Sequence, residues 1–268
     1  MSWEGLDVSI LGPACLAGLI VLTTHVPLGM RVLARGIIFI DLAIAQIAAL
    51  GVILAQFFGM DEHAFVVQIA AAIAALLGAS LLSATDKRWP EYQEPLIGTA
   101  FVLAASGALL LLANNPHGGE HLKNLLVGQI LWVSPSQLWT AAIGSAALLA
   151  VIAWRSGRLI GLSFYAVFAL AITISVQLIG VYLVFTSLIV PALATTGMRG
   201  KTRLFIAYSI GICGYVSGLI FSAVFDLPSG AMIVWTLAAC GLIAQALPLV
   251  RRSHRAQTEI RTRAENQA

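Results

Sequence analysis

The sequence has very few charged residues for its length. Only 10% of its 268 residues are charged, 15 basic and 12 acidic, whereas 59% are hydrophobic and the mean hydropathy is +0.93. A soluble domain of this size needs a polar surface, which this composition does not supply. The composition therefore excludes a cytosolic enzyme core, a coiled coil and a disordered chain. The net charge of +3 does not indicate a nucleic acid partner, because membrane proteins concentrate lysine and arginine in their cytoplasmic loops.

Cysteines and nucleotide-binding motifs are also scarce. The three cysteines, Cys15, Cys213 and Cys240, lie in apolar runs without CxxC spacing, so they indicate neither a disulfide framework nor a zinc finger. The sequence contains no GxxxxGK[ST] phosphate loop, so the chain cannot bind ATP in the P-loop manner. It contains no HExxH motif and no nucleophile elbow either. We therefore predict a protein that is not an enzyme.

Long apolar runs fill most of the chain, and a bilayer crossing needs about 20 helical residues. Eight runs are candidates: residues 8–26, 36–58, 64–84, 96–113, 138–154, 159–194, 204–225 and 231–250. As one straight helix, residues 159–194 would be about 54 Å long, nearly twice the membrane thickness, so this run must fold back. The turn is expected at residues 177–180. We predict an all-α bundle of eight to nine transmembrane segments, with one domain over residues 1–250 and a basic cytoplasmic tail over residues 251–268.

Lysine and arginine are concentrated in alternate connections between these runs. They are Arg31 and Arg35, Lys87 and Arg88, Arg155 and Arg158, then Arg199, Lys201 and Arg203, and finally the tail. Because basic loops stay on the cytoplasmic side of a membrane, these connections are predicted to be cytoplasmic. The N-terminus then lies outside and the C-terminus lies inside.

Three polar residues within the apolar runs are candidates for a transport path. Asp41 is an acidic residue well inside a predicted span, where a charge is costly unless it faces protein or water. Gln46 lies five residues further on, so the two side chains can line one cavity at different heights. Gln177 lies at the expected turn, where free carbonyl groups can line a cavity. The alternative for Asp41 is a local cap or ion pair near the cytoplasmic headgroups, shortly after Arg35.

The connection between the fourth and fifth runs contains His117, Glu120 and His121. Two imidazoles and a carboxylate suit zinc or manganese. The HxxEH spacing of metalloproteases needs a stable helix, however, and Gly118 and Gly119 oppose one. Two alternatives stay open: a loop that captures an incoming cation, and a solvated loop with incidental histidines. An intramembrane metalloprotease is poorly supported.

Four stretches in order along the chain, residues 16–56, 125–139, 176–195 and 217–234, carry a more specific signal. They resemble the permease subunits of the zinc, manganese and iron ABC importers, the ABC-3 metal permeases. The first stretch is similar to that family's first two helices and their basic loop. The third is similar to its Gly-to-Pro-Ala-Ala segment, and the fourth to its final Asp-x-Pro-x-Gly connection.

The resemblance implies a homodimeric permease in the bacterial inner membrane. It receives a divalent metal, zinc or alternatively manganese or iron, from a periplasmic metal-binding protein and is driven by separate ABC ATPase subunits. No permanently bound cofactor is expected, and the transported metal ion is the cargo. The path would include Asp41, Gln46 and Gln177, with His117, Glu120 and His121 as outer metal ligands. ATPase docking is assigned to the cytoplasmic arginines Arg155, Arg158, Arg199 and Arg203.

The sequence departs from the family pattern in three places, one of which is Gln129, where the family has an acidic residue after the glycine at position 128. In the family, the second helix usually carries an aspartate and, four residues on, a histidine that face the metal path. Here Gln46 occupies the histidine position, and Asp41 is displaced by one residue from the aspartate position. In addition, the family has about 15 more residues before residue 159, including a cytoplasmic helix that docks on the ATPase. An ATP-independent secondary transporter or channel on the same scaffold is therefore the alternative function.

The path hypothesis predicts the effect of removing the carboxylate at position 41. We expect Asp41→Ala to lower metal accumulation in cells without lowering the abundance of the protein, because a path ligand is lost. Elemental analysis of cells grown at limiting metal measures this effect. Unchanged uptake would remove Asp41 from the path.

Overall fold

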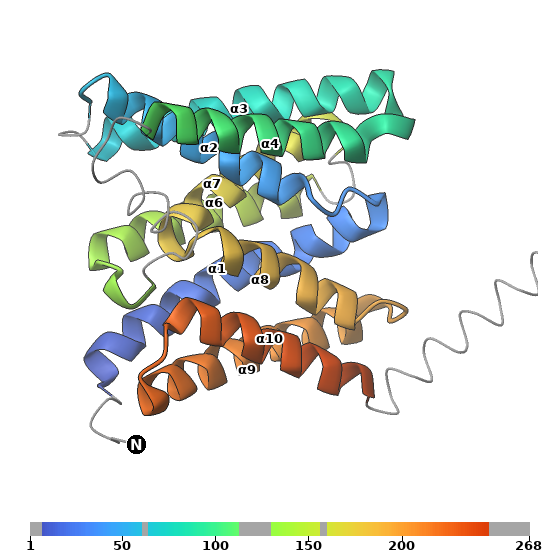
Figure 1. The fold of residues 1–268 in the computed structure, drawn as a ribbon. Coiled ribbons are helices and arrows are strands. Elements are labelled where there is room, and N and C mark those ends of the chain that lie inside the picture. Colours follow the sequence, from blue (N-terminus) through green and yellow to red (C-terminus); the bar gives the residue numbers. More distant parts are fainter. Residues whose placement is uncertain (1–6, 61–63, 113–129, 156–159, 247–268) are drawn as a thin grey trace, which may run out of the picture.

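The computed structural model describes residues 7–60, 64–112, 130–155 and 160–246, and these residues form helices without any β-strand. The helices are α1 (Val8–Arg35), α2 (Ile40–Phe57), α3 (Ala64–Arg88), η2 (Pro90–Tyr92), α4 (Gln93–Leu112), η3 (Ile130–Trp132), α6 (Pro135–Trp154), α7 (Leu162–Ile179), α8 (Val181–Ala194), α9 (Gly200–Phe225) and α10 (Ser229–Ala246). Figure 1 shows them arranged as a single bundle. The predicted all-α bundle is confirmed.

Eight of the described helices are long and apolar enough to cross a membrane, judged by length and composition, and α8 is a shorter apolar helix of 14 residues. This agrees with the predicted eight to nine segments. The outward face of α3 presents exposed apolar side chains one helical turn apart: Phe65, Ile69, Ile73, Leu77 and Leu81. Exposed tryptophans flank α6, with Trp132 and Trp139 near its start and Trp154 at its end. Both features are typical of a helix bundle in lipid.

The long run over residues 159–194 is divided at Gly180. This residue ends α7 and begins α8 with φ 81° and ψ 164°, a conformation that only glycine adopts without strain. The break lies within the predicted turn at residues 177–180. In Figure 1, α8 ends at the right of the view, where α1 and α3 also end, so the chain folds back at Gly180.

Helix α1 continues well past the predicted end of its apolar run at residue 26. It passes through Pro27 and ends at Arg35, where Gly36 adopts the left-handed conformation of a helix C-cap. Proline in a helix removes the hydrogen bond to the carbonyl four residues earlier, which here is that of Thr23. The hydroxyl of Tyr208 on α9 donates to that carbonyl at 3.0 Å. A contact between helices thus satisfies the group that Pro27 leaves free.

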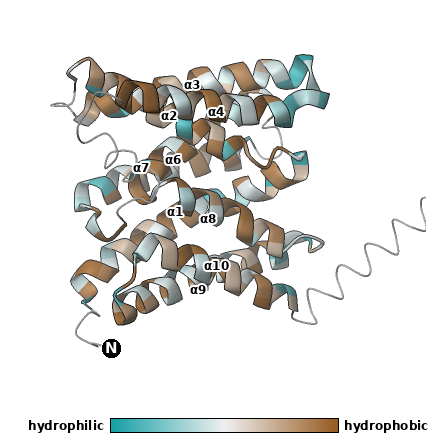
Figure 2. Cartoon of the chain, in the orientation of Figure 1, coloured by the Kyte–Doolittle hydropathy of each residue, from teal (hydrophilic) through white to brown (hydrophobic). Residues whose placement is uncertain are grey.

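Charged and polar side chains join the ends of several helices on one side of the bundle. The guanidinium of Arg35, at the end of α1, lies 3.9 Å from the ring centroid of Phe164 on α7. The amide of Gln93 on α4 donates to the hydroxyl of Tyr165 at 3.1 Å, and the backbone N–H of Ile38 donates to Glu94 at 2.6 Å. Figure 2 shows hydrophilic residues gathered at the end of α3 and the start of α4. The basic connections of α1 and α3 therefore lie at the same end.

Helices α9 and α10 pack closely through glycines. Gly214 and Gly218 form a GxxxG pair on α9 and face α10, which crosses there with Ile233, Thr236 and Leu237. The hydroxyl of Thr236 donates to the carbonyl of Gly214 at 2.7 Å. Small residues allow such backbone approach, which replaces the hydrophobic driving force that is absent between helices in lipid.

This packing predicts the effect of one added methyl group. The Cβ of Gly218→Ala would lie 2.6 Å from the Cα of Ile233, so the two helices must move apart. Overpacking of this kind costs about 1–3 kcal/mol, and we expect a lower thermal unfolding midpoint of the purified protein in detergent. The control is Gly98→Ala on α4, whose Cβ meets no atom within 4 Å. Equal midpoints for the two variants would contradict the proposed close contact.

Candidate transport path

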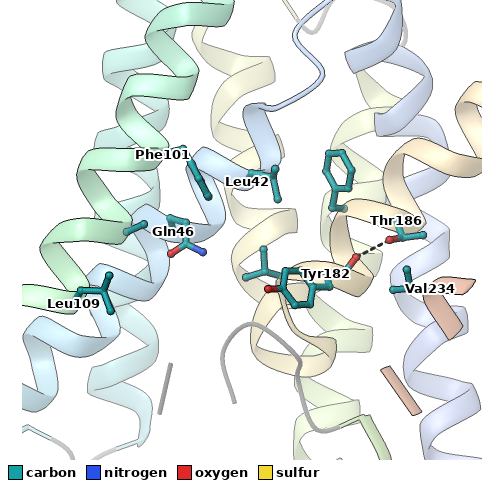
Figure 3. Close-up of a pocket in the computed structure, with 10 residues that line it drawn as sticks. Leu42, Gln46, Phe101, Leu109, Tyr182, Thr186 and Val234 are labelled. Carbon is teal, nitrogen blue, oxygen red and sulfur yellow. Dashed lines mark hydrogen bonds between the residues drawn. The ribbon is translucent and has the colours of Figure 1, made fainter. Parts of the chain in front are cut away.

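A pocket of about 570 Å³ lies between α2, α4, α8 and α10 (Figure 3). Its lining comprises Leu42 and Gln46 from α2, Phe101, Ala105 and Leu109 from α4, Val181, Tyr182, Phe185 and Thr186 from α8, and Val234 from α10. None of these ten side chains is charged. The pocket therefore brings together the second, fourth, eighth and tenth helices around a mainly apolar space.

The two α2 residues of the pocket share one face because they lie four positions apart in a helix. Gln46 is only 4% exposed, and its amide is directed toward the space between the helices in Figure 3. Within the described part of the chain no hydrogen bond of this amide is found. Its oxygen and N–H groups can therefore bind a ligand in this pocket.

Helix α8 supplies the opposite wall. Tyr182, Phe185 and Thr186 lie in its first two turns and face the same way because they are three and four residues apart. The hydroxyl of Thr186 already donates to the carbonyl of Tyr182 at 2.8 Å. The ring of Phe185 stacks on Phe39, with centroids 6.3 Å apart and planes 3° from parallel. These α8 residues were not predicted from the sequence, although their helical spacing directly after Gly180 was a usable signal.

Asp41 does not line this pocket. It lies in the first turn of α2, is 1% exposed, and neither carboxylate oxygen has a hydrogen-bond partner among the described residues. At about 100° per residue, its side chain is rotated about 140° from Gln46 around the helix axis. Its position in the first turn places it near the positive end of the α2 dipole, which favours a negative charge. The role of Asp41 on a transport path stays a prediction, and asparagine is the better test variant because it preserves the buried volume.

Gln177 lies in a different, more polar pocket of about 490 Å³ between α2, α3, α6 and α7. Four glutamines contribute to it: Gln56, Gln68, Gln137 and Gln177. They come from the end of α2, the starts of α3 and α6, and the end of α7, away from the end that holds Arg35. The structure therefore does not bring Asp41, Gln46 and Gln177 together in one cavity.

The predicted metal and docking residues are only partly described. His117, Glu120, His121, Arg158 and the tail over residues 251–268 lie outside the described residues. Arg155 and Arg199 are exposed at helix ends, and Arg203 is half-buried in the first turn of α9. Across the described ranges, no group of three His, Cys, Asp or Glu residues is placed to hold a metal ion.

The different orientations of positions 41 and 42 can be tested with thiol reagents. In a variant without Cys15, Cys213 and Cys240, we expect Leu42→Cys to react at least about tenfold faster than Asp41→Cys with a charged methanethiosulfonate, because only position 42 lines the pocket. Mass spectrometry of timed samples gives the two rates. Faster modification at position 41 would place the pocket on the other face of α2.

Comparison with known proteins gives similarity along nearly the whole chain. Manganese transport system membrane protein MntC of Halalkalibacterium halodurans is 27% identical over 263 residues, which cover 90% of this chain and 87% of that protein. A probable iron transport system membrane protein of Haemophilus influenzae is 32% identical over 154 residues, covering 49% of this chain and 56% of that protein. The solved structure of PsaBC from Streptococcus pneumoniae in complex with Fab has a chain with the same fold, with a TM-score of 0.74, 22% identity, and coverage of 91% of this chain and 95% of that chain.

The family model of the ABC 3 transport family matches residues 7–164 and 156–247. The two matched segments overlap at residues 156–164. Together they include every described helix and both walls of the pocket. The chain belongs to the ABC 3 transport family.

Proposed function

We propose that this chain is the membrane-spanning permease of an ABC importer for a transition metal, manganese or iron. The observation that carries the proposal is the match to the manganese transport protein MntC over 90% of this chain, on a bundle with eight helices of membrane-spanning length in its described part. The iron transport relative supports the same class of cargo. Zinc stays a prediction from the sequence.

The proposed mechanism is based on helix α8. Its first two turns carry the pocket residues Tyr182, Phe185 and Thr186, and its last turn leads directly to Arg199. Helix α8 packs against α1 and α10, and the break at Gly180 separates it from α7. A movement imposed on the Arg199 end would therefore reach the pocket through this one helix, which contains Pro191 in its last turn. Alternating access would follow from rocking of α8 as ATPase subunits close.

The basic end of the bundle is the proposed docking surface for those ATPase subunits. Arg155 and Arg199 are exposed there, and the basic connection at Lys87 and Arg88 lies at the same end. This assignment places the C-terminus in the cytoplasm of the bacterial cell, in agreement with the distribution of positive charge. The opposite end, with the glutamine-lined pocket around Gln177, would meet a periplasmic metal-binding protein.

A homodimer completes the proposed path. Tyr182 lines the pocket but remains 52% exposed, and Phe39, whose ring stacks on that of Phe185, is equally exposed at 52%. Exposed aromatic side chains next to a pocket are typical of surfaces that a partner covers. A second copy on this surface would enclose the pocket between two α8 helices.

One observation favours the alternative of an ATP-independent transporter. The family model matches in two segments that overlap at residues 156–164. The resemblance leads us to expect a longer connection there, with a helix that docks on the ATPase. An importer of this kind would function without ATPase subunits. Purification of the chain from its native membrane distinguishes the two, because a bound P-loop ATPase is expected only for an ABC importer.

The transport function is tested by deleting the gene. We expect the deletion strain, grown at limiting metal, to accumulate less manganese or iron, since the permease is the route of entry, and we expect the wild-type gene to restore accumulation. Elemental analysis of washed cells measures all transition metals together. An unchanged content of every metal in the deletion strain would contradict the proposal.

A further inference from the structure

The glutamine-lined pocket of about 490 Å³ is bounded by the starts of α3 and α6 and by the end of α7. Helix α7 packs against both of the other helices and contributes Ile174, Gln177 and Leu178 to the lining. The side chain of Ile174 lies close to Gly144 of α6, where an added Cβ would be 2.8 Å from its Cδ1. The two walls of the pocket are therefore held in place by their packing on α7.

The carboxamides of this pocket are short of hydrogen-bond partners. The side-chain nitrogen of Gln177 is buried and has none. No hydrogen bond of the Gln56 or Gln68 amide is found in the described part of the chain. The oxygen of Gln137 accepts from the backbone N–H of Ser134 at 2.9 Å, so its side-chain N–H groups remain available. Since each amide offers two donors and an acceptor oxygen, the pocket suits a ligand that both accepts and donates hydrogen bonds.

The charge of the pocket narrows the ligand further. None of the described lining residues is charged. Anionic headgroups and anionic small molecules are recognised by lysine and arginine, and burying a charge without a counter-charge is strongly unfavourable. A zwitterionic ligand carries its own counter-charge. Its phosphate can accept from amide N–H groups, and its ammonium can donate to amide oxygens.

The pocket also borders the lipid-facing surface of the bundle. Phe65 is 76% exposed, lines the pocket and begins the apolar stripe of α3 that continues through Ile69 and Ile73. On α6, Trp139 is 72% exposed and precedes the lining residue Thr140, as is typical at the depth of lipid headgroups. At about 1.5 Å per residue, the stripe from Phe65 to Ile73 is about 12 Å long, close to half of the hydrocarbon thickness of about 30 Å. One acyl chain can therefore lie along it.

We propose that this pocket binds the headgroup of a zwitterionic phospholipid, phosphatidylethanolamine, with an acyl chain along the apolar stripe of α3. The phosphate accepts hydrogen bonds from amide N–H groups, including that of Gln177, and the ammonium donates to amide oxygens. The lipid joins α3, α6 and α7 at the end of the bundle opposite Arg35. This site is separate from the surface around Tyr182 and Phe39 that the second copy would cover.

Native mass spectrometry of the purified, delipidated full chain tests the inference. The protein in detergent is titrated with phosphatidylethanolamine and, separately, with phosphatidylglycerol that has the same acyl chains. We expect the zwitterionic lipid to bind about fivefold more tightly, because the described lining offers no cation to the anionic one. Gln177→Met should weaken binding of phosphatidylethanolamine by about tenfold, because it removes hydrogen bonds to a charged group and leaves an unbranched side chain of similar size.

Two further variants complete the test. Gln245→Met is the matched control, since its amide lies outside the pocket and makes only a 3.4 Å hydrogen bond to the carbonyl of Leu193 on α8; its lipid binding should stay unchanged. Gln68→Lys adds a cation to the pocket and should reverse the preference in favour of phosphatidylglycerol. This gain of binding does not depend on the stability of the Gln177 variant. Size-exclusion profiles confirm that each variant is folded.

Three outcomes would overturn the inference: equal binding of the two lipids by the wild-type chain, equal binding of phosphatidylethanolamine by wild type and Gln177→Met, and an unchanged preference in Gln68→Lys. Soluble phosphoethanolamine carries the same charged groups without acyl chains, and we expect it not to displace the lipid at equal concentration. Displacement would contradict a lipid site and indicate a free small molecule instead. None of these results affects the deletion experiment, so the importer function is tested separately.

Discussion

The structure depends on one constraint: inside a bilayer every backbone N–H and C=O group needs a partner within the protein. Helices satisfy these groups locally, which is why the described part of the chain is helical and why its apolar runs become spans. Where a helix cannot satisfy a backbone group locally, another part of the protein does so. At Pro27 the carbonyl of Thr23 loses its helical donor, and the hydroxyl of Tyr208 on α9 replaces it at 3.0 Å. Helix α1 thereby stays continuous and is tied to α9.

The break at Gly180 is the exception with functional consequences. A straight helix through this run would be too long for the membrane, and the glycine conformation allows the chain to fold back between α7 and α8. The short α8 that results carries the pocket residues at one end and leads to Arg199 at the other. A backbone requirement therefore produces the element that connects the pocket with the proposed docking end.

The sequence predicted the helical class, the number of spans and the turn at residues 177–180, because length, hydropathy and glycine position are local properties. It did not predict which face of α2 borders the pocket. In a soluble helix the apolar stripe indicates the buried face, but α2 is apolar around most of its circumference because lipid and protein interior are both apolar. Asp41 and Gln46 therefore both drew attention as polar residues in this span, whereas Leu42 and Gln46 line the pocket. Only packing against α4 and α8 distinguishes these positions.

The sequence by itself determined that this chain is a polytopic helical membrane protein, because that class follows from the hydropathy of the chain. It also determined the transport family, because the family motifs lie in order along the chain. The tertiary structure decided which polar residues share a cavity. Gln46 and Gln177 lie in separate pockets, and Tyr182 joins Gln46 across the space between α2 and α8. These relations depend on how each helix is rotated about its axis and which helices are neighbours. Both are set by contacts between residues far apart in sequence, such as Gly218 with Ile233 and Tyr208 with Thr23.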